Sequence, residues 1–285
     1  FNTLQMGMVA AERIFGILET EAQIEDQGTL TKLSLKGTIN FENVHFSYLP
    51  DQEVLHGISF AIEPGETVAI VGATGAGKST IINLLSRFYE WDKGVIKIDE
   101  YDIRALKLHE LRKHVGVVLQ DVFLFADTIH NNITLNNPDI SEATVVAAAK
   151  TIGVHEFITT LPGGYQYNVK ERGVMLSAGQ RQLIAFLRAY ISNPSILVLD
   201  EATSSIDSYS EELIQKAMAK ITKNKTSLII AHRLATIKNA DRIIVMDKGK
   251  IVEMGDHKTL LKIENGFYAK LHQVQFLNQE STAIA

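Results

Sequence analysis

The chain of 285 residues contains no cysteine, so disulfide bonds are excluded as a source of stability. This absence leaves the redox compartment open, although it fits a cytosolic chain. No apolar run approaches the roughly 20 residues that a membrane-spanning helix needs, so these residues do not cross a bilayer by themselves. Basic runs are also missing and the formal net charge is -5, which gives no support to a nucleic-acid-binding surface.

The N-terminus lacks both an initiating methionine and a signal peptide, because the chain begins with Phe1. We expect it to be a fragment of a longer polypeptide. Its length is enough for one large domain or two small ones, with a sizeable core in either case.

The most informative stretch is a glycine-rich loop between the apolar run 67–71 and a helix-like run at 81–85. Residues 72–80 read GATGAGKST and fit the phosphate-binding pattern G-x-x-x-x-G-K-[ST]. Glycines let backbone N–H groups approach phosphate oxygens, and the helix that follows points its positive end at the same anion. We predict that Lys78 binds the β- and γ-phosphates and that the Ser79 hydroxyl ligates Mg²⁺. The predicted nucleotide contacts of this loop are Gly72, Thr74, Gly75, Ala76, Gly77, Lys78, Ser79 and Thr80.

The segments before this loop predict a helix, a linker and a small sheet. Residues 1–20 have apolar side chains at helical spacing, which indicates either a short helix packed on the domain or the end of a longer helix. Residues 21–36 are mostly polar and read as a linker. Residues 37–60 alternate as strands do, with a slip near Asn43 that suits a bulge, and predict a small antiparallel sheet before the loop.

Four apolar runs after the loop each end at polar residues. Continuous apolar runs are typical of strands buried on both faces, as in a parallel sheet covered by helices. The runs and the residues that end them are 115–119 before Gln120, 196–199 before Asp200 and Glu201, 228–231 before His232, and 243–246 before Asp247. Because ligands of open α/β sheets sit beyond the carboxyl ends of the strands, we expect Gln120, Asp200, Glu201 and His232 to share one edge with the phosphate-binding loop.

The remaining segments read as helices. Residues 121–190 are mainly helical and predict a separate helical lobe, and residues 208–222 and 256–275 predict two more helices. The last ten residues, 276–285, carry little apolar pattern and are expected to fray.

The residues at the strand ends suit the hydrolysis of a nucleotide. A carboxylate such as Asp200 can hold Mg²⁺ through its water shell, and Glu201 is placed as a base that orients or deprotonates the attacking water. Gln120 is predicted to contact the metal and the water, and His232 to donate to the γ-phosphate. The alternatives are an Asp-Glu pair that caps the next helix, an ordinary polar residue at 120 and a structural histidine at 232.

A second informative stretch is the sequence LSAGQ at residues 176–180. Ser177 and Gln180 form an S-x-x-Q capping box, which predicts a helix that starts at Ala178. A helix start with a free hydroxyl and the unobstructed N–H of Gly179 is an anion site. The alternative is a plain helix cap, because capping boxes are common.

In order and spacing these motifs resemble those of the ATPase domains of ABC transporters. The counterparts are Walker A at 72–80, the Q-loop at Gln120, the signature at 176–180, Walker B at Asp200 and Glu201, the D-loop at 204–207 and the H-loop at His232. Residues 171–173 resemble the x-loop of exporters, and residues 10–15 resemble the end of an exporter's last membrane-proximal helix. The resemblance covers about residues 37–265.

The resemblance implies a fold and its boundaries. The fold is an α/β P-loop NTPase with a RecA-like core of mainly parallel sheet, an antiparallel β subdomain and a helical subdomain at about 121–190. The ATPase domain would occupy residues 37–275. It would follow the end of a membrane-proximal helix and a linker at 1–36, and precede the frayed tail at 276–285.

The resemblance also implies a composite site for ATP and Mg²⁺. Two nucleotide-binding domains pair head to tail in this family, so that the signature of one contacts the ATP held by the other. The implied trans contacts are Ser177, Ala178, Gly179, Gln180 and Asp207. The implied catalytic residues are Glu201, His232, Lys78 and Gln120, and the implied metal ligands are Ser79, Gln120 and Asp200. Tyr48 resembles the aromatic residue that stacks on adenine, a contact worth about 1–3 kcal/mol by analogy with base stacking; the alternative is a core residue in register with Val44 and Phe46.

One position departs from the family pattern, since Ala178 replaces the glycine of the usual LSGGQ. If Ala178 is the first residue of a helix, its φ is negative and a Cβ is tolerated, so we expect a modest effect. A changed signature beside an intact Glu201 also occurs in heterodimeric exporters, and we keep a heterodimer as a hypothesis beside a homodimer.

The leading interpretation is the ATP-hydrolysing part of an exporter. Its partners would be a second nucleotide-binding domain and a transmembrane domain fused upstream, with no nucleic acid, and it would lie at the cytoplasmic face of the cell membrane. The link to the membrane domain is expected near residues 120–132, where residues 122–125 offer an apolar docking surface or, alternatively, belong to the core of the helical lobe. Drug, lipid and peptide cargoes all stay open.

Two other functions compete with the exporter. A soluble ABC ATPase that acts on DNA or the ribosome would carry coiled-coil insertions or tandem ATPase domains, and neither is visible here. A regulatory nucleotide binder needs no base, so Glu201 is evidence against it.

Overall fold

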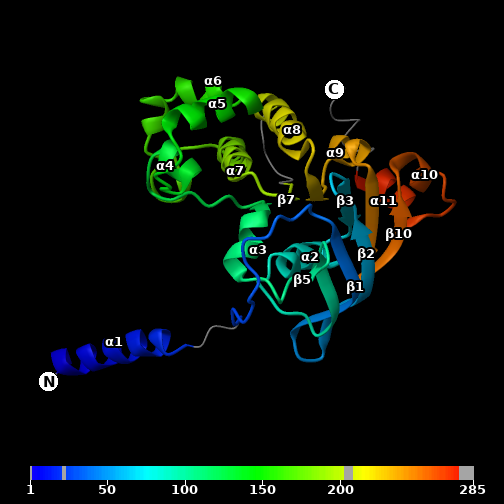
Figure 1. Cartoon of the computed structure of the whole chain (residues 1–285), viewed down its shortest axis with the longest axis horizontal. Helices are drawn as coiled ribbons and strands as arrows, with labels where there is room; N and C mark the ends of the chain where they lie inside the picture. Colours follow the sequence, from blue (N-terminus) through cyan, green and yellow to red (C-terminus); the bar gives the residue numbers. More distant parts are fainter. Residues whose placement is uncertain (1, 21–23, 202–207, 276–285) are drawn as a thin grey trace.

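The computed structural model describes residues 2–20, 24–201 and 208–275, which form two β-sheets surrounded by helices (Figure 1). The four-stranded sheet has the order β2-β1-β4-β5 and the six-stranded sheet has the order β10-β9-β3-β8-β7-β6. The strands of the smaller sheet are β1 (Ile39–Leu49), β2 (Gln52–Ile62), β4 (Lys93–Ile98) and β5 (Tyr101–Asp102). Those of the larger sheet are β3 (Thr67–Gly72), β6 (Val115–Val118), β7 (Ile196–Asp200), β8 (Thr226–Ile230), β9 (Arg242–Asp247) and β10 (Lys250–Gly255).

The larger sheet is mainly parallel, as the continuous apolar runs predict. Strand β3 pairs in parallel with β8 and β9, and β7 pairs in parallel with β8 and β6. Strand β10 is the exception, because it pairs antiparallel with β9 at the edge. Strand β10 was not predicted, because its residues are exposed and half-buried in alternation and it lacks a continuous apolar run.

The larger sheet separates two hydrophobic cores, and successive residues of one strand belong to different cores. In β3, Ala69 and Val71 pack in one core, whereas Val68 and Ile70 pack in the other. This alternation is that of a strand covered on both faces. The first core holds the helices of the upper lobe in Figure 1, and the second holds α2 and the smaller sheet.

The smaller sheet confirms the predicted bulge and corrects the predicted position of the sheet. Asn43 has a φ of 48°, and the pairing of β1 with β2 shifts between Phe41 and Val44. The sheet is not built only from residues before the phosphate-binding loop, because β4 follows α2 and pairs antiparallel with β1. This pairing joins two strands that are separated in the chain by the glycine-rich loop and α2. A local sequence pattern therefore does not predict it.

The helices follow the predicted segments with some differences. They are α1 (Asn2–Leu18), α2 (Lys78–Leu85), α3 (Leu108–His114), α4 (Ile129–Thr134), α5 (Glu142–Ile152), α6 (His155–Thr160), α7 (Ala178–Ser192), α8 (Ser208–Thr222), α9 (Leu234–Asn239), α10 (His257–Leu261) and α11 (Phe267–Gln275). The single helix predicted at 256–275 is in fact α10 and α11. The short helices α3 and α9 were not predicted, because six or seven residues hold too few turns to show a periodic pattern.

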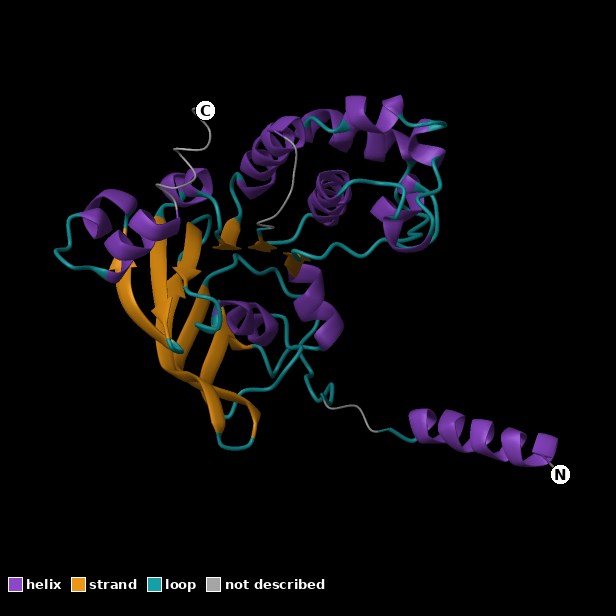
Figure 2. Cartoon of the chain, turned by 180° about the vertical axis from the view of Figure 1, so that it is seen from behind, coloured by secondary structure: helices purple, strands orange, loops and turns teal. Residues whose placement is uncertain are grey.

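The N-terminal segment consists of a projecting helix and a packed strap. Helix α1 extends away from the rest of the chain in both views, so the packed-helix alternative is wrong here (Figures 1 and 2). The predicted linker is not free along its whole length, because the Leu33 N–H donates to Glu110 of α3 and Leu35 is buried. Within the described residues no helix combines the length and apolar character needed to span a membrane. The tail at 276–285 lies outside the described residues.

Gly249 joins the two sheets to the glycine-rich loop, and it generates a prediction about stability. It has a φ of 74°, its N–H donates to the Ala76 carbonyl, its carbonyl accepts from the His56 N–H, and a Cβ would lie 2.1 Å from the Val54 carbonyl oxygen. Gly249→Ala should therefore lower the free energy of unfolding by about 1–2 kcal/mol for the positive φ and by roughly 1–3 kcal/mol more for the steric overlap.

Gly65→Ala is the matched control, because Gly65 has a φ of 81° but open space around the position of a Cβ. Gly65→Ala should lower the free energy of unfolding only by the cost of the positive φ, without the cost of a steric overlap. Denaturant unfolding of both variants measures the difference, and equal destabilisation would contradict the proposed steric contact.

Candidate nucleotide-binding site

The site begins at one edge of the larger sheet, where the parallel strands end. Gly72 closes β3, Asp200 closes β7, His232 follows β8 by two residues and Gln120 follows β6 by two. Because these strands run in the same direction, the four residues share an edge, as the sequence predicts.

The glycine-rich loop has the backbone of an anion cradle. Gly72 has a φ of 153°, and a Cβ there would lie 2.3 Å from the Met246 carbonyl oxygen of β9. Gly77 is the N-cap of α2 with a φ of 98° and supplies no side-chain hydrogen bond to the first turn. The N–H groups that begin a helix have no acceptor within the helix, so this uncapped turn is suited to a phosphate.

Lys78 is held inside this loop. Its side chain is 8% exposed, and its Nζ donates to the carbonyl oxygens of Gly72 at 2.9 Å and Ala73 at 3.0 Å. Burial lowers the pKa of Lys78, and the nearby charge of Asp200 opposes that shift. The two hydrogen-bond acceptors of the ammonium group are neutral carbonyl oxygens, which favours the arrival of an anion.

The donor set near Lys78 fits a hydrated Mg²⁺ ion. Ser79 is exposed at the start of α2, and Asp200 is half-buried at the end of β7. Burial raises the pKa of Asp200, Lys78 lowers it, and Asp121 raises it. A hydroxyl and a carboxylate are oxygen ligands of the kind that Mg²⁺ takes, usually with water and substrate phosphates.

Glu201 is buried in a network of donors that sequence analysis did not predict. The side chain is 3% exposed, and its Oε2 accepts from the backbone N–H groups of His232 at 3.1 Å and Arg233 at 3.2 Å. Its Oε1 accepts from the Thr236 hydroxyl at 2.8 Å and from the Gln215 amide at 3.2 Å. Burial raises the pKa of Glu201, whereas the Thr236 hydroxyl, the backbone N–H groups of His232 and Arg233 and the positive charge of Arg233 lower it. The carboxylate therefore ties the end of β7 to the start of α9.

His232 is half-buried beside this network. Burial lowers the pKa of its imidazole, and the positive charge of Lys78 lowers it further. Near pH 7 the ring is therefore neutral, with one nitrogen as a donor and the other as an acceptor.

Tyr48 is not a core residue, so that alternative is wrong. Its ring is 42% exposed, its hydroxyl accepts from the Asn83 amide at 3.1 Å, and the same hydroxyl lies 3.2 Å from Thr80 Oγ1. The ring packs edge-to-face against Phe46 and Tyr89. Tyr89 is an exposed aromatic beside the loop helix that sequence analysis missed, because no motif marks it.

The second predicted anion site is the start of α7. The capping box is present: the Ser177 hydroxyl accepts from the Gln180 N–H, and the Gln180 side chain accepts from the Ser177 N–H. Ala178 is the first helical residue and does not have a positive φ, as the sequence predicts. A cavity of about 300 Å³ lies between this turn, Gln120 and Arg172.

The structure thus gathers the predicted residues into two groups. The loop, Asp200, Glu201 and His232 form one, and Gln120 lines a cavity with the start of α7. Helices α2 and α7 pack in different cores on opposite faces of the sheet. The predicted D-loop residues 204–207, including Asp207, lie outside the described residues.

Comparison with known proteins agrees with this geometry. A protein-family model described as ABC transporter matches residues 55–204. The chain is 49% identical over 275 residues to an ATP-dependent lipid A-core flippase of Saccharophagus degradans, a match that covers 96% of this chain and 47% of the flippase. It is 46% identical to an uncharacterized ABC transporter ATP-binding protein of Bacillus subtilis, covering 100% of this chain and 46% of that protein.

A solved structure shows the same fold. A bacterial Atm1-family ABC exporter with ATP bound superimposes with a TM-score of 0.86 at 41% identity, covering 96% of this chain and 48% of the exporter chain. The chain spans about half the length of the curated relatives it matches. With the phosphate-binding loop, the strand-end carboxylates and the capped signature helix in place, the chain belongs to the ABC transporter family and carries its nucleotide-binding ATPase domain.

Proposed function

We propose that this chain hydrolyses ATP with Mg²⁺ as half of a head-to-tail pair of ATPase domains and powers export across a membrane. The observation that carries the proposal is the shared strand edge, where Lys78, Asp200 and Glu201 surround an uncapped helix start. The relatives named as a flippase and an exporter also favour this function over a soluble ATPase that acts on DNA or the ribosome.

In the proposed site the loop from Gly72 to Thr80 binds the phosphates, and Lys78 exchanges its two carbonyl partners for phosphate oxygens. A phosphate is a better acceptor for an ammonium group than a neutral carbonyl, because charge-assisted hydrogen bonds are stronger. Tyr48, which is fixed to α2 through its hydroxyl, presents an exposed ring for adenine. Ser79 and Asp200 would hold Mg²⁺, which neutralises charge that develops on the phosphates. Gln120, which lies at the same strand edge but lines the cavity beside α7, would complete the ligand set.

In the proposed reaction Glu201 is the base and His232 donates to the γ-phosphate. Burial raises the pKa of the Glu201 carboxyl toward the range useful for a base near pH 7. Four hydrogen-bond donors and the Arg233 guanidinium, whose Nε lies 3.5 Å from Glu201 Oε1, now hold this carboxylate. They must loosen before the carboxylate contacts a water molecule, so this network controls the proposed base. The neutral His232 ring provides an N–H donor without competing with Lys78 for the charge of the phosphate.

The trans contacts of the signature require a second ATPase domain. Helix α7 starts at a capped turn and packs in a different core from α2, which supports an ATP partner on another chain. Ser177, Gly179 and Gln180 would contact that ATP, with Asp207 near the boundary between the domains. Since the φ of Ala178 is not positive, its methyl group costs no backbone strain, and both a homodimer and a heterodimer are compatible with it.

The sequence left two alternatives for residues 122–125, an apolar docking surface or part of the core of the helical lobe, and each applies to part of the segment. Leu124 is fully buried in the helical core, whereas Phe123 and Phe125 are 54% and 55% exposed and pack edge-to-face at 5.2 Å. Arg188 of α7 donates to the Phe123 carbonyl and to the Asn132 carbonyl, which fixes the segment to the signature helix. We assign the two exposed rings to the contact with a transmembrane domain, and α1 to the end of a helix from that domain.

The length of the relatives supports this arrangement, because they are about twice as long as the chain and have room for a membrane domain. Such a domain would lie upstream in the same polypeptide, and the ATPase domain would face the cytoplasm.

Removal of the loop lysine tests nucleotide binding. Lys78→Ala should weaken ATP affinity by roughly 10–100-fold, which corresponds to the loss of a charged hydrogen bond. Calorimetric titration with ATP measures the change, and Lys93→Ala on the exposed start of β4 is the matched control. Equal affinities for the two variants would exclude the phosphate contact.

Removal of the carboxylate charge tests the base. Glu201→Gln should retain ATP binding and slow hydrolysis by about 10²–10⁴-fold, the range of a general base. Thr236→Val removes one donor of the network and keeps the carboxylate, so it should lower thermal stability more than it lowers turnover. Single-turnover assays and thermal unfolding of both variants separate the two roles, and near-normal hydrolysis by Glu201→Gln would show that Glu201 is not the base.

Replacement of the exposed rings tests coupling to the membrane domain. In the full-length transporter, Phe123→Ser with Phe125→Ser should abolish most transport and spare basal ATP hydrolysis, because both rings are exposed in the ATPase domain. Leu124→Ser is the contrasting variant, and it should destabilise the domain by about 2–5 kcal/mol because it opens the core. If the double variant destabilises the domain as much as Leu124→Ser does, Phe123 and Phe125 belong to the core, and the proposed contact with the membrane domain is wrong.

A further inference from the structure

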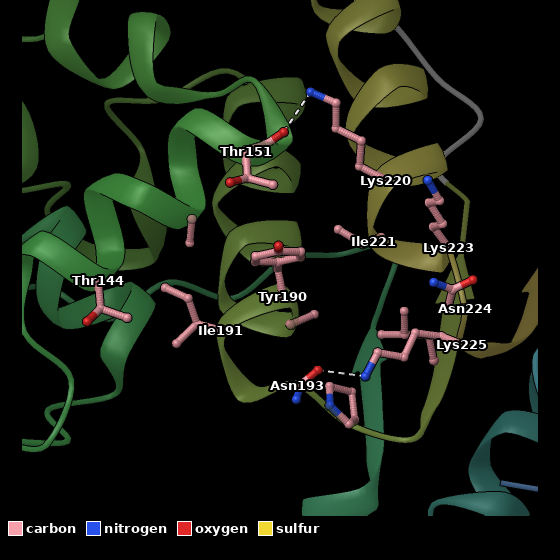
Figure 3. A pocket seen from close by; sticks show the side chains of 14 residues that line it. Thr144, Thr151, Tyr190, Ile191, Asn193, Lys220, Ile221, Lys223, Asn224 and Lys225 are labelled. Atoms are coloured by element: carbon pink, nitrogen blue, oxygen red, sulfur yellow. Dashed lines mark hydrogen bonds between the residues drawn. The ribbon is translucent and has the colours of Figure 1, made fainter. Parts of the chain in front are cut away.

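A large cavity opens between α5, α7 and α8, at the edge of the sheet opposite the nucleotide site (Figure 3). Its volume is about 830 Å³, within the range of small-molecule pockets. Asn193 and Pro194 lie just before β7 and Lys225 lies just before β8, so the cavity adjoins the amino ends of the parallel strands. None of its lining residues belongs to the nucleotide site, so the inference goes beyond the proposed function.

The floor of this cavity is apolar. The side chains of Leu197 from β7 and Ile221 from α8 are almost fully buried, and Ala148 from α5 and Ala189 from α7 also line the cavity. Tyr190 stands at the centre of the view and forms a wall (Figure 3). Water gains few hydrogen bonds against such a surface, so the floor favours an apolar ligand group.

The rim of the cavity is cationic. Lys220, Lys223 and Lys225 line it together with the amides of Asn193 and Asn224, and the lining residues include no aspartate or glutamate. This concentration of positive charge contrasts with the net charge of -5 of the chain. Like charges gathered without a carboxylate favour an anion between them.

Hydrogen bonds orient two of the rim lysines, Lys220 and Lys225, and no carboxylate in the described part of the chain pairs with them. Lys220 Nζ donates to the Thr151 carbonyl of α5 at 2.6 Å, and Lys225 Nζ donates to Asn193 Oδ1 at 2.6 Å (Figure 3). Both acceptors are uncharged, and an ammonium group has three donors, so each lysine keeps two for a ligand. Burial lowers the pKa of Lys225, as expected for a cation that pairs with no carboxylate of residues 2–20, 24–201 and 208–275.

We propose that this cavity binds a small anionic amphiphile, a molecule with a phosphate or carboxylate head and an apolar body. The head contacts Lys223 and Lys225 at the rim, and the body covers Leu197 and Ile221 on the floor. An inorganic anion leaves the floor uncovered, and a neutral apolar molecule leaves the lysines without a counter-charge. The two halves of the ligand therefore act together.

Calorimetric titration of the purified chain tests this site, with saturating ADP present so that the phosphate-binding loop is occupied. The probes are octyl phosphate, octanoate, inorganic phosphate and octanol. We expect saturable binding of octyl phosphate or octanoate at one site, and about tenfold or weaker affinity for inorganic phosphate and for octanol, each of which lacks one half of the interaction. The better of the two amphiphiles identifies the head group.

The variant Lys223→Gln with Lys225→Gln should weaken binding of the preferred amphiphile by about tenfold or more, since two charged hydrogen bonds are lost. Lys216→Gln is the matched control, because Lys216 lies on α8, pairs with Glu212 and does not line the cavity. Ala148→Leu fills the floor and should weaken binding without a change of charge. Unchanged ADP affinity and unfolding midpoint report that each variant is folded.

Three results would overturn the proposal. The first is the absence of saturable binding by either amphiphile. The second is inorganic phosphate or octanol that binds as tightly as the amphiphiles. The third is equal affinity in the double-lysine variant and in Lys216→Gln.

Discussion

The backbone pairing of β3 with β8 and β9 is the constraint on which the rest of the structure depends. In this register Ala69 pairs with Ile229 on one side and with Ile243 on the other, and all three strands end at the same edge. The edge positions the glycine-rich loop after β3 and His232 after β8. Because alternate residues of these strands pack in different cores, a slip of one residue would turn each strand over and break both cores.

Buried charge at this edge is held by neutral donors and acceptors as well as by opposite charge. Lys78 donates to backbone carbonyls, and Glu201 accepts backbone and side-chain donors from α9 and its neighbours. A buried charge with such partners is stable in the absence of a ligand. It can still exchange these neutral partners for a charged ligand, with which it forms stronger hydrogen bonds. In our proposal Lys78 exchanges its carbonyl partners for phosphate oxygens when ATP binds. Hydrolysis requires Glu201 to exchange its donors for a water molecule.

Helix α7 connects distant parts of the ATPase domain. It starts at the capped signature turn, holds the segment with Phe123 through Arg188, and ends at the floor of the cationic cavity. A helix of this length is a stiff element, so a displacement at one end is carried to the other. The start of this helix is the proposed contact with a second ATPase domain, its Arg188 holds the segment proposed to contact a membrane domain, and its last turn lines the proposed amphiphile cavity.

By itself the sequence determined the parts of the protein that local pattern encodes. The glycine-rich loop, the continuous apolar strands and the S-x-x-Q capping box each depend on residues close together in the chain, and the structure agrees with all three. The same holds for the bulge at Asn43 and for the polar residues that end the strands.

Tertiary structure alone decided the contacts between distant segments. Three such features are not visible in the local sequence pattern. They are the pairing of β4 with β1, the hydrogen bond between Glu201 and Thr236, and the exposure of Phe123 and Phe125 beside the buried Leu124. The physical reason is that each of these features depends on which segment packs against which, and such packing is a property of the closed fold and not of any window of the chain.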